Sequence, residues 1–86
     1  MRIFKPWEVV ANIYTRATIT TMFRESKDDI RVVLKVKQRR NGTYKYRCEA
    51  YHVSGDFLSD LDLFYILSVE PEEGPFHEAV KKYNLQ

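Results

Sequence analysis

Apolar and polar side chains alternate along two neighbouring stretches in the middle of the chain. Every second residue from Ile30 to Val36 is apolar, and most of the intervening residues are basic. After a polar segment, residues Tyr44 to His52 alternate in the same way. A period of two is typical of strands with one buried face, and a Gly-containing segment between two such stretches is typical of a hairpin. We therefore predict a β-hairpin over residues 30–53.

The length of the hairpin loop follows from the need to keep one face apolar. A two-residue loop would place Val36 opposite Arg47 and mix the two faces, whereas a three-residue loop, Arg40 to Gly42, places Val36 opposite Tyr46. A slip of one residue moves every side chain to the other face, so the apolar pattern selects the register. The longer loop also puts Gly42 at the left-handed position of a type I turn with a G1 bulge. We predict the three-residue loop.

The segment before the hairpin also alternates with a period of two, and it is rich in β-branched residues between Thr18 and Thr21. Such residues disfavour helix, so we predict a strand over residues 17–24. For residues 7–15 we favour a strand, with a helix that begins at Pro6 as the alternative. The polar residues 25–29 are predicted to connect this strand to the hairpin.

The C-terminal half is more ambiguous. The run Leu63 to Leu67 is apolar at every position, which predicts a strand buried on both faces, although Phe57 to Val69 also contains a helical stripe. Residues Glu70 to Gly74 are predicted to form a turn. Pro75 then begins a short helix that ends at Tyr83. The pattern as a whole predicts an α+β fold: a small twisted antiparallel β-sheet of about four or five strands with a short C-terminal helix. Closure into a barrel stays open as an alternative.

Composition places the chain among small globular proteins. Its 86 residues include 44% hydrophobic residues and twelve aromatic ones, enough for a single domain over residues 1–86 with one small core. A lone Cys48 excludes an internal disulfide and fits a reducing compartment. The sequence shows no apolar signal segment and no stretch long enough to cross a membrane. We therefore expect a cytoplasmic protein that does not bind membranes.

Charge is distributed unevenly, although the net charge is only +2. Residues 1–47 contain twelve Lys and Arg against four Asp and Glu, whereas residues 48–80 contain eight acids and no Lys or Arg. This division predicts either two surfaces of opposite sign or two halves that neutralise each other in the fold.

The predicted register gathers basic residues on one face of the hairpin. Lys35 lies opposite Arg47 and Lys37 opposite Lys45, and like charges directly opposite destabilise a sheet by up to about 1 kcal/mol per pair. Three explanations are open: a bound polyanion, a solvated face, or coverage by the acidic segment 56–73. We favour nucleic acid as the ligand. The residues predicted to bind it are Lys35, Lys37, Arg39, Arg40, Lys45 and Arg47 through phosphates, and Tyr51 through stacking.

A protein partner is the alternative. An interaction or inhibitor module of the kind that phages and mobile elements encode would bind an acidic protein surface, or a second copy in a homodimer, through its oppositely charged faces. An exposed Trp and the acidic segment would then form the contacts. The candidate residues for this interface are Trp7, Asp60, Asp62, Glu70, Glu72 and Glu73.

Signatures of catalysis, metal binding and cofactor binding are not evident. Asp60 and Asp62 lack the Gly and the terminal Glu of a calcium loop. A ribonuclease built on His52, Glu49 and Arg47 is conceivable, but neither histidine has a nucleophile at a typical spacing. The signature residues of Sm-like, SH3-like and OB barrels cannot be placed on the chain either. We therefore expect a non-enzymatic binding protein without a cofactor.

Overall fold

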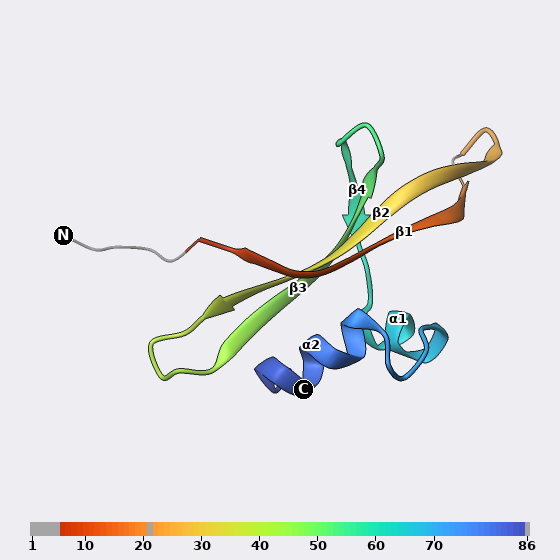
Figure 1. Cartoon of the computed structure of the whole chain (residues 1–86). Coiled ribbons are helices and arrows are strands. Elements are labelled where there is room, and N and C mark those ends of the chain that lie inside the picture. Colours follow the sequence, from red (N-terminus) through yellow and green to blue (C-terminus); the bar gives the residue numbers. More distant parts are fainter. Residues whose placement is uncertain (1–5, 21, 86) are drawn as a thin grey trace.

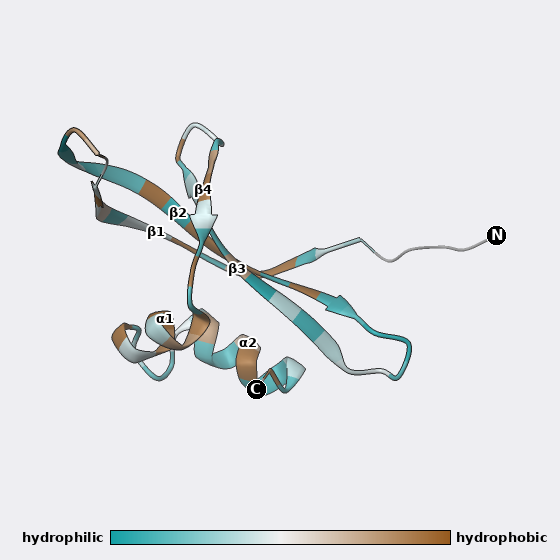
Figure 2. Ribbon diagram, turned by 180° about the vertical axis from the view of Figure 1, so that it is seen from behind, coloured by the Kyte–Doolittle hydropathy of each residue, from teal (hydrophilic) through white to brown (hydrophobic). Residues whose placement is uncertain are grey.

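The computed structural model describes residues 6–20 and 22–85, and its fold is α+β, as the sequence predicts. Its strands form one antiparallel sheet in the order β1-β2-β3-β4, and β1 does not pair with β4 within the described residues, so the sheet is open (Figure 1). Both helices lie on the same side of the sheet (Figures 1 and 2). The elements are β1 (Glu8–Thr20), β2 (Glu25–Gln38), β3 (Tyr44–His52), β4 (Phe57–Asp60), α1 (Leu63–Val69) and α2 (Pro75–Tyr83).

The hairpin of β2 and β3 has the predicted register. Val36 pairs with Tyr46, and the backbone N–H of Arg39 donates to the carbonyl of Thr43 at 2.6 Å, which closes the three-residue loop. Gly42 adopts φ +86°, a conformation in which a side chain would be strained. The apolar pattern and the turn chemistry therefore identified this register correctly.

The hydrophobic core lies between the apolar face of the sheet and the two helices. Leu34 at the centre of β2 and Phe76 on α2 are both fully buried, and Leu63 on α1 is 2% exposed. Figure 2 shows apolar and polar residues alternating along the strands. Burying a side chain as large as that of Phe76 contributes roughly 2–3 kcal/mol. Helix packing therefore uses one face of the sheet and leaves the other open.

The first strand, β1, is a single strand with a bulge between Val9 and Ala11, so the helical alternative for residues 7–15 is wrong. It ends at Thr20, whereas the prediction ended the strand at residue 24; Thr21 lies outside the described residues.

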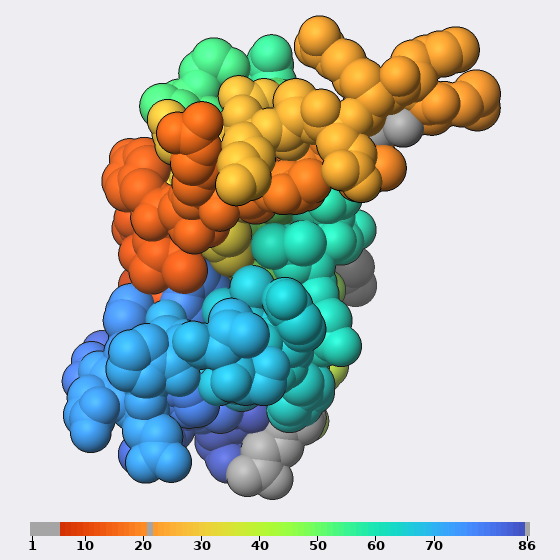
Figure 3. All heavy atoms as spheres, turned by 90° about the vertical axis from the view of Figure 1, so that its right-hand side faces the viewer, coloured from red at the N-terminus to blue at the C-terminus, as the bar shows by residue number. Residues whose placement is uncertain are grey.

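The predicted connector at residues 25–29 is also wrong, because these residues begin β2. They pair with the second half of β1, where Arg16 lies directly opposite Asp29. This part of the ribbon projects beyond the rest of the molecule (Figure 3), so polar residues on both faces remain hydrated and need no apolar alternation. Opposite charges across the pair support the pairing instead.

The predicted strand at Leu63 to Leu67 is wrong as well, because this run lies in α1. Asp62 caps the helix, and its side chain accepts a hydrogen bond from the backbone N–H of Phe64 at 2.9 Å. Phe64 and Tyr65 are 55% and 65% exposed, while Leu63 and Ile66, three residues apart, face the core. The run is apolar on both sides, but only one side is buried.

The C-terminal helix, α2, occupies the predicted residues and has an unusual cap. Its N-cap residue, Gly74, has no side chain to accept hydrogen bonds. Glu70 takes this role from the preceding loop, because its Oε1 accepts from the backbone N–H groups of Phe76 at 2.9 Å and His77 at 3.1 Å. A carboxylate at this end of a helix also interacts favourably with the helix dipole.

Candidate nucleic-acid interface

The open face of the sheet carries the basic residues that the sequence singled out. Odd-numbered residues of β2 and β3 point away from the helices, and among them Lys35 pairs with Arg47 and Lys37 with Lys45. Arg39 and Arg40 lie at the end of the same hairpin and are exposed. We call the surface formed by Lys35, Lys37, Arg39, Arg40, Lys45 and Arg47 the basic face.

Glu49 relieves part of the repulsion on this face. It is only 5% exposed, and its carboxylate lies 2.8 Å from Lys35 Nζ and 3.5 Å from Arg47 Nη2. Arg47 also contacts Asp60 on β4 at 3.3 Å. The predicted repulsion between Lys35 and Arg47 is therefore relieved by a carboxylate that contacts both. Strand alternation puts Glu49 on the same face as Arg47, two residues away on β3, whereas its contact with Lys35 crosses from β3 to β2.

A short hydrogen-bond network holds this part of the face. The Tyr51 hydroxyl donates to Glu49 Oε1 at 2.9 Å and accepts from Lys35 Nζ at 2.8 Å. The hydrogen bond from Lys35 lowers the pKa of Glu49, and the bonds to Glu49 and Tyr51 raise the pKa of Lys35. Both shifts favour the charged forms, so the two residues form an ion pair at neutral pH.

Aromatic side chains lie among the cations. Tyr51 has Arg31 and Lys35 each 5.3 Å from the centre of its ring, and it meets Phe57 of β4 edge to face at 5.7 Å. Sequence reasoning predicted Tyr51 but missed Arg31 and Phe57. The position of Phe57 depends on β4, which pairs with β3 through a bulge, so alternation could not assign its face.

Trp7, a candidate for a protein interface, lies on the basic face. Its ring is 5.6 Å from Lys45 Nζ and 6.0 Å from the Arg47 guanidinium. These distances are typical of cation–π contacts. The N-terminal segment thus brings a second aromatic ring to the hairpin, and no local signal in the sequence reveals this contact.

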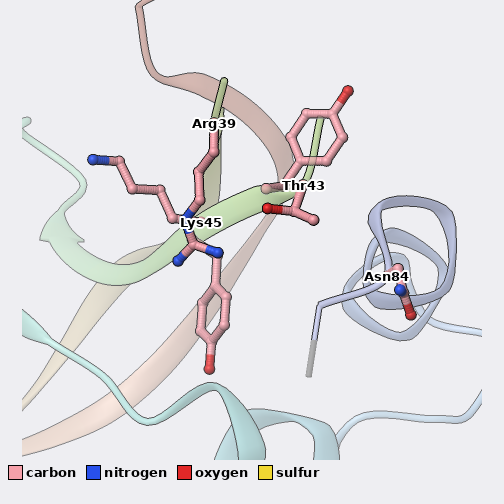
Figure 4. A pocket seen from close by; sticks show the side chains of 6 residues that line it. Arg39, Thr43, Lys45 and Asn84 are labelled. Carbon is pink, nitrogen blue, oxygen red and sulfur yellow. The ribbon is translucent and has the colours of Figure 1, made fainter. Parts of the chain in front are cut away.

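Four cations of the basic face have no acidic partner. Lys37, Arg39, Arg40 and Lys45 form no ion pair with the acids of residues 6–20 and 22–85. Arg39 and Lys45 also line a cleft of about 310 Å³ at the end of the hairpin, together with Asn84, which follows α2 (Figure 4). Positive charge is therefore concentrated toward the hairpin loop.

The acidic segment does not cover this surface. Asp60 contacts Arg47, but Asp62 caps α1 and Glu70 caps α2, both on the helical side of the sheet. Glu72 and Glu73 are exposed in the loop between the helices. The explanation of the basic face by an internal acidic cover is therefore wrong for the hairpin end, and only Arg47 is paired with an acid of this segment among the described residues. The described residues also contain no cluster of His, Cys, Asp and Glu that could hold a metal ion.

The residues considered for a ribonuclease are separated by the sheet. His52 follows the even-numbered, helix-facing residues of β3 and lies 3.8 Å from Asp28, whereas Glu49 and Arg47 are on the open face. Cys48 is buried in the core, and desolvation, with smaller effects of nearby negative charges, raises the pKa of its thiol to about 11. This thiol is protonated at neutral pH and is a core group.

Comparison with known proteins assigns no function to the chain, so the geometry of the basic face is the basis for assigning one. None of the helices in the described part of the chain is long and apolar enough to span a membrane. The chain matches no protein-family model, no curated protein and no solved structure.

Proposed function

We propose that this protein binds nucleic acid through its basic face and catalyses no reaction on it. The observation that carries the proposal is the group of four cations without acidic partners, on a sheet face that the helices leave uncovered. The pair of Lys37 and Lys45 places like charges directly opposite each other. Phosphate groups between them would replace this repulsion by attraction and release counterions from the nucleic acid.

The charge distribution also indicates how the ligand would lie. Glu49 and Asp60 neutralise the end of the face near β4, so phosphates would concentrate on the hairpin end, where Arg39 and Lys45 flank the cleft. Guanidinium groups bind phosphate oxygens in pairs, and ammonium groups act as point charges. Both kinds of donor are present within a few residues of the loop.

A salt titration tests the proposal. Fluorescence anisotropy with labelled RNA and DNA should give log–log plots of affinity against salt with a slope of about −0.7 to −0.9 per phosphate contact. Replacing Lys37 and Lys45 by Gln should weaken binding and make this slope less steep, by the amount that about two phosphate contacts contribute. The matched control replaces Lys81 and Lys82 of α2 by Gln, which removes the same charge from the opposite side. Absence of binding at low salt, or equal losses in both variants, would refute the proposal.

A protein-interaction or inhibitor module is the second candidate, and a different surface favours it. Phe64, Tyr65 and Val69 of α1 are each more than half exposed. Tyr65 and Val69 also line an apolar groove of about 780 Å³ between α1 and the projecting ribbon. Exposed apolar groups of this kind mark interaction surfaces. Either function fits a reducing, cytoplasmic location, which the free thiol of Cys48 supports.

A further inference from the structure

Resting on the proposed function, we infer that the ligand is a single-stranded nucleic acid, whose bases stack on the aromatic rings of the open face. The rings lie at two places along β3: Tyr51 with Phe57 near β4, and Trp7 above Lys45 and Arg47. The unpartnered cations lie beside the second place. This arrangement combines flat apolar surfaces for bases with positive charge for the backbone, as single-strand binding requires.

The exposure of the rings supports base stacking. Tyr51 and Trp7 are half-buried, whereas Phe57 is 52% exposed and Tyr14, which pairs with Arg31 and therefore shares this face, is 69% exposed. A purely electrostatic face has no need for large aromatic groups in water. Single strands present the flat faces of their bases, whereas a duplex hides those faces in its stack.

The shape of the surface around Tyr51 and Phe57 opposes a duplex that binds through its major groove. That groove is about 12 Å wide and admits one helix or a two-stranded ribbon. Among the described residues, four strands lie side by side only where Glu49 to Tyr51 of β3 pair with β4, and there, at a spacing of about 4.8 Å, the face with its side chains is wider than the groove.

The spacing of the two aromatic places fits a short strand. Four to six residues of β3 separate Tyr51 from the cations beneath Trp7, which corresponds to about 13–20 Å at ~3.3 Å per residue. About four to six nucleotides at a stacked spacing of ~3.4 Å cover this length. Sites of this size are typical of single-strand binding modules.

Tyr51 is held ready for stacking before the ligand arrives. Its hydroxyl is fixed by Glu49 and Lys35, so the ring loses little freedom on binding. The guanidinium of Arg31 lies over the ring, 5.3 Å from its centre, so a base on that side would stack on the outer surface of this planar group.

The test compares single strands of RNA and DNA of about 12 nucleotides with a duplex that has the same number of phosphates, at one salt concentration. We expect the protein to bind either single strand at least about tenfold more tightly than the duplex. Phe57→Leu should weaken single-strand binding about tenfold and leave duplex binding unchanged. Tyr65→Leu on α1 is the matched control and should change neither. Because Trp7 is the sole tryptophan, its fluorescence should be quenched by the single strand.

The outcomes separate this inference from the proposed function. Duplex binding equal to or tighter than single-strand binding, or an unchanged affinity of the Phe57→Leu variant for single strands, would overturn the inference and leave nucleic-acid binding intact. If the wild-type protein binds none of the probes at low salt, both the inference and the proposed function are overturned. Circular dichroism of each variant identifies a loss of binding that is due to unfolding. Phe57→Tyr is the second variant: it keeps an aromatic ring at this position, so it should keep its affinity for single strands.

Discussion

Glu49→Gln should have opposite effects on stability and on nucleic-acid affinity. Glu49 is buried, accepts hydrogen bonds from Lys35 and Tyr51, and lies 3.5 Å from Arg47. Gln has nearly the same shape and retains one acceptor oxygen, but it removes the negative charge. The folded protein therefore loses an ion pair, while the basic face gains one unit of positive charge.

The expected loss of stability is about 1–2 kcal/mol. A hydrogen bond to a charged group contributes about 1.5–3 kcal/mol, and the neutral bond that Gln can still form recovers part of it. Arg47 adds little, because its side chain is 49% exposed and solvent screens the pair. For a domain of this size, the loss corresponds to a decrease in Tm of roughly 5–15 °C. Affinity for a single strand should rise about 3- to 10-fold at low salt, because the face loses one charge that repels phosphate.

The stability effect should depend on pH in a defined way. The pKa of Glu49 is lowered in the folded state, so its contribution is present above about pH 4.5 and is lost as pH falls through the folded pKa. The pKa of Lys35 is raised, so its contribution is present below about pH 10.5 and is lost as pH rises through its folded pKa. Urea unfolding of the wild type and of Glu49→Gln should give a constant difference in the free energy of unfolding between these limits. The difference should shrink at lower pH.

Asp60→Asn is the matched control. It removes the same charge beside the same Arg47, but from a carboxylate that is 67% exposed, so we expect a loss of stability below about 0.5 kcal/mol. Equal stability of wild type and Glu49→Gln would refute the role assigned to the buried carboxylate. Weaker nucleic-acid binding by the folded Glu49→Gln variant would show that the basic face is not the binding surface.

Three further predictions concern the core and the helix caps. Phe76→Ala should cost about 3–5 kcal/mol, a large part of the stability of a domain of this size, and should leave much of the chain unfolded by circular dichroism at 37 °C. Gly74→Ala should lower stability by about 1–2 kcal/mol in urea unfolding, because the new Cβ would collide with the carboxylate of Glu70 that caps α2; an unchanged midpoint would contradict this cap. The Cys48 thiol, whose pKa is raised to about 11, should resist a thiol reagent at pH 8 until denaturant is added, and immediate labelling would contradict its burial.

Local pattern was sufficient for the central hairpin and for α2. Alternation with a period of two, together with the steric demands of Gly42, allowed one register and placed Lys35, Lys37, Lys45 and Arg47 on one face. Pro75 and the apolar spacing behind it marked the last helix. These signals are local because residues that contact each other in a hairpin or a helix are close in sequence. Both elements can therefore be predicted without information on distant segments.

Local pattern failed where burial on one side decides the structure. The run from Leu63 to Leu67 is apolar enough for a buried strand, but the capping Asp62 and the limited contact with the sheet make it a helix with Phe64 and Tyr65 in water. The polar start of β2 predicts a loop but is a strand, because a projecting ribbon has no buried face to impose alternation.

The sequence by itself determined that one face of the hairpin is basic, because strand alternation and turn geometry are local. Only the tertiary structure decided what surrounds that face. It packed both helices on the opposite side, buried Glu49 between Lys35 and Arg47, and brought Trp7 over β3. Except for that of Glu49 with Arg47, these contacts join segments that are far apart along the chain, and their energies depend on side-chain distances of a few ångströms. The pattern of residue types along the chain does not determine such distances, because they depend on how the strands are assembled.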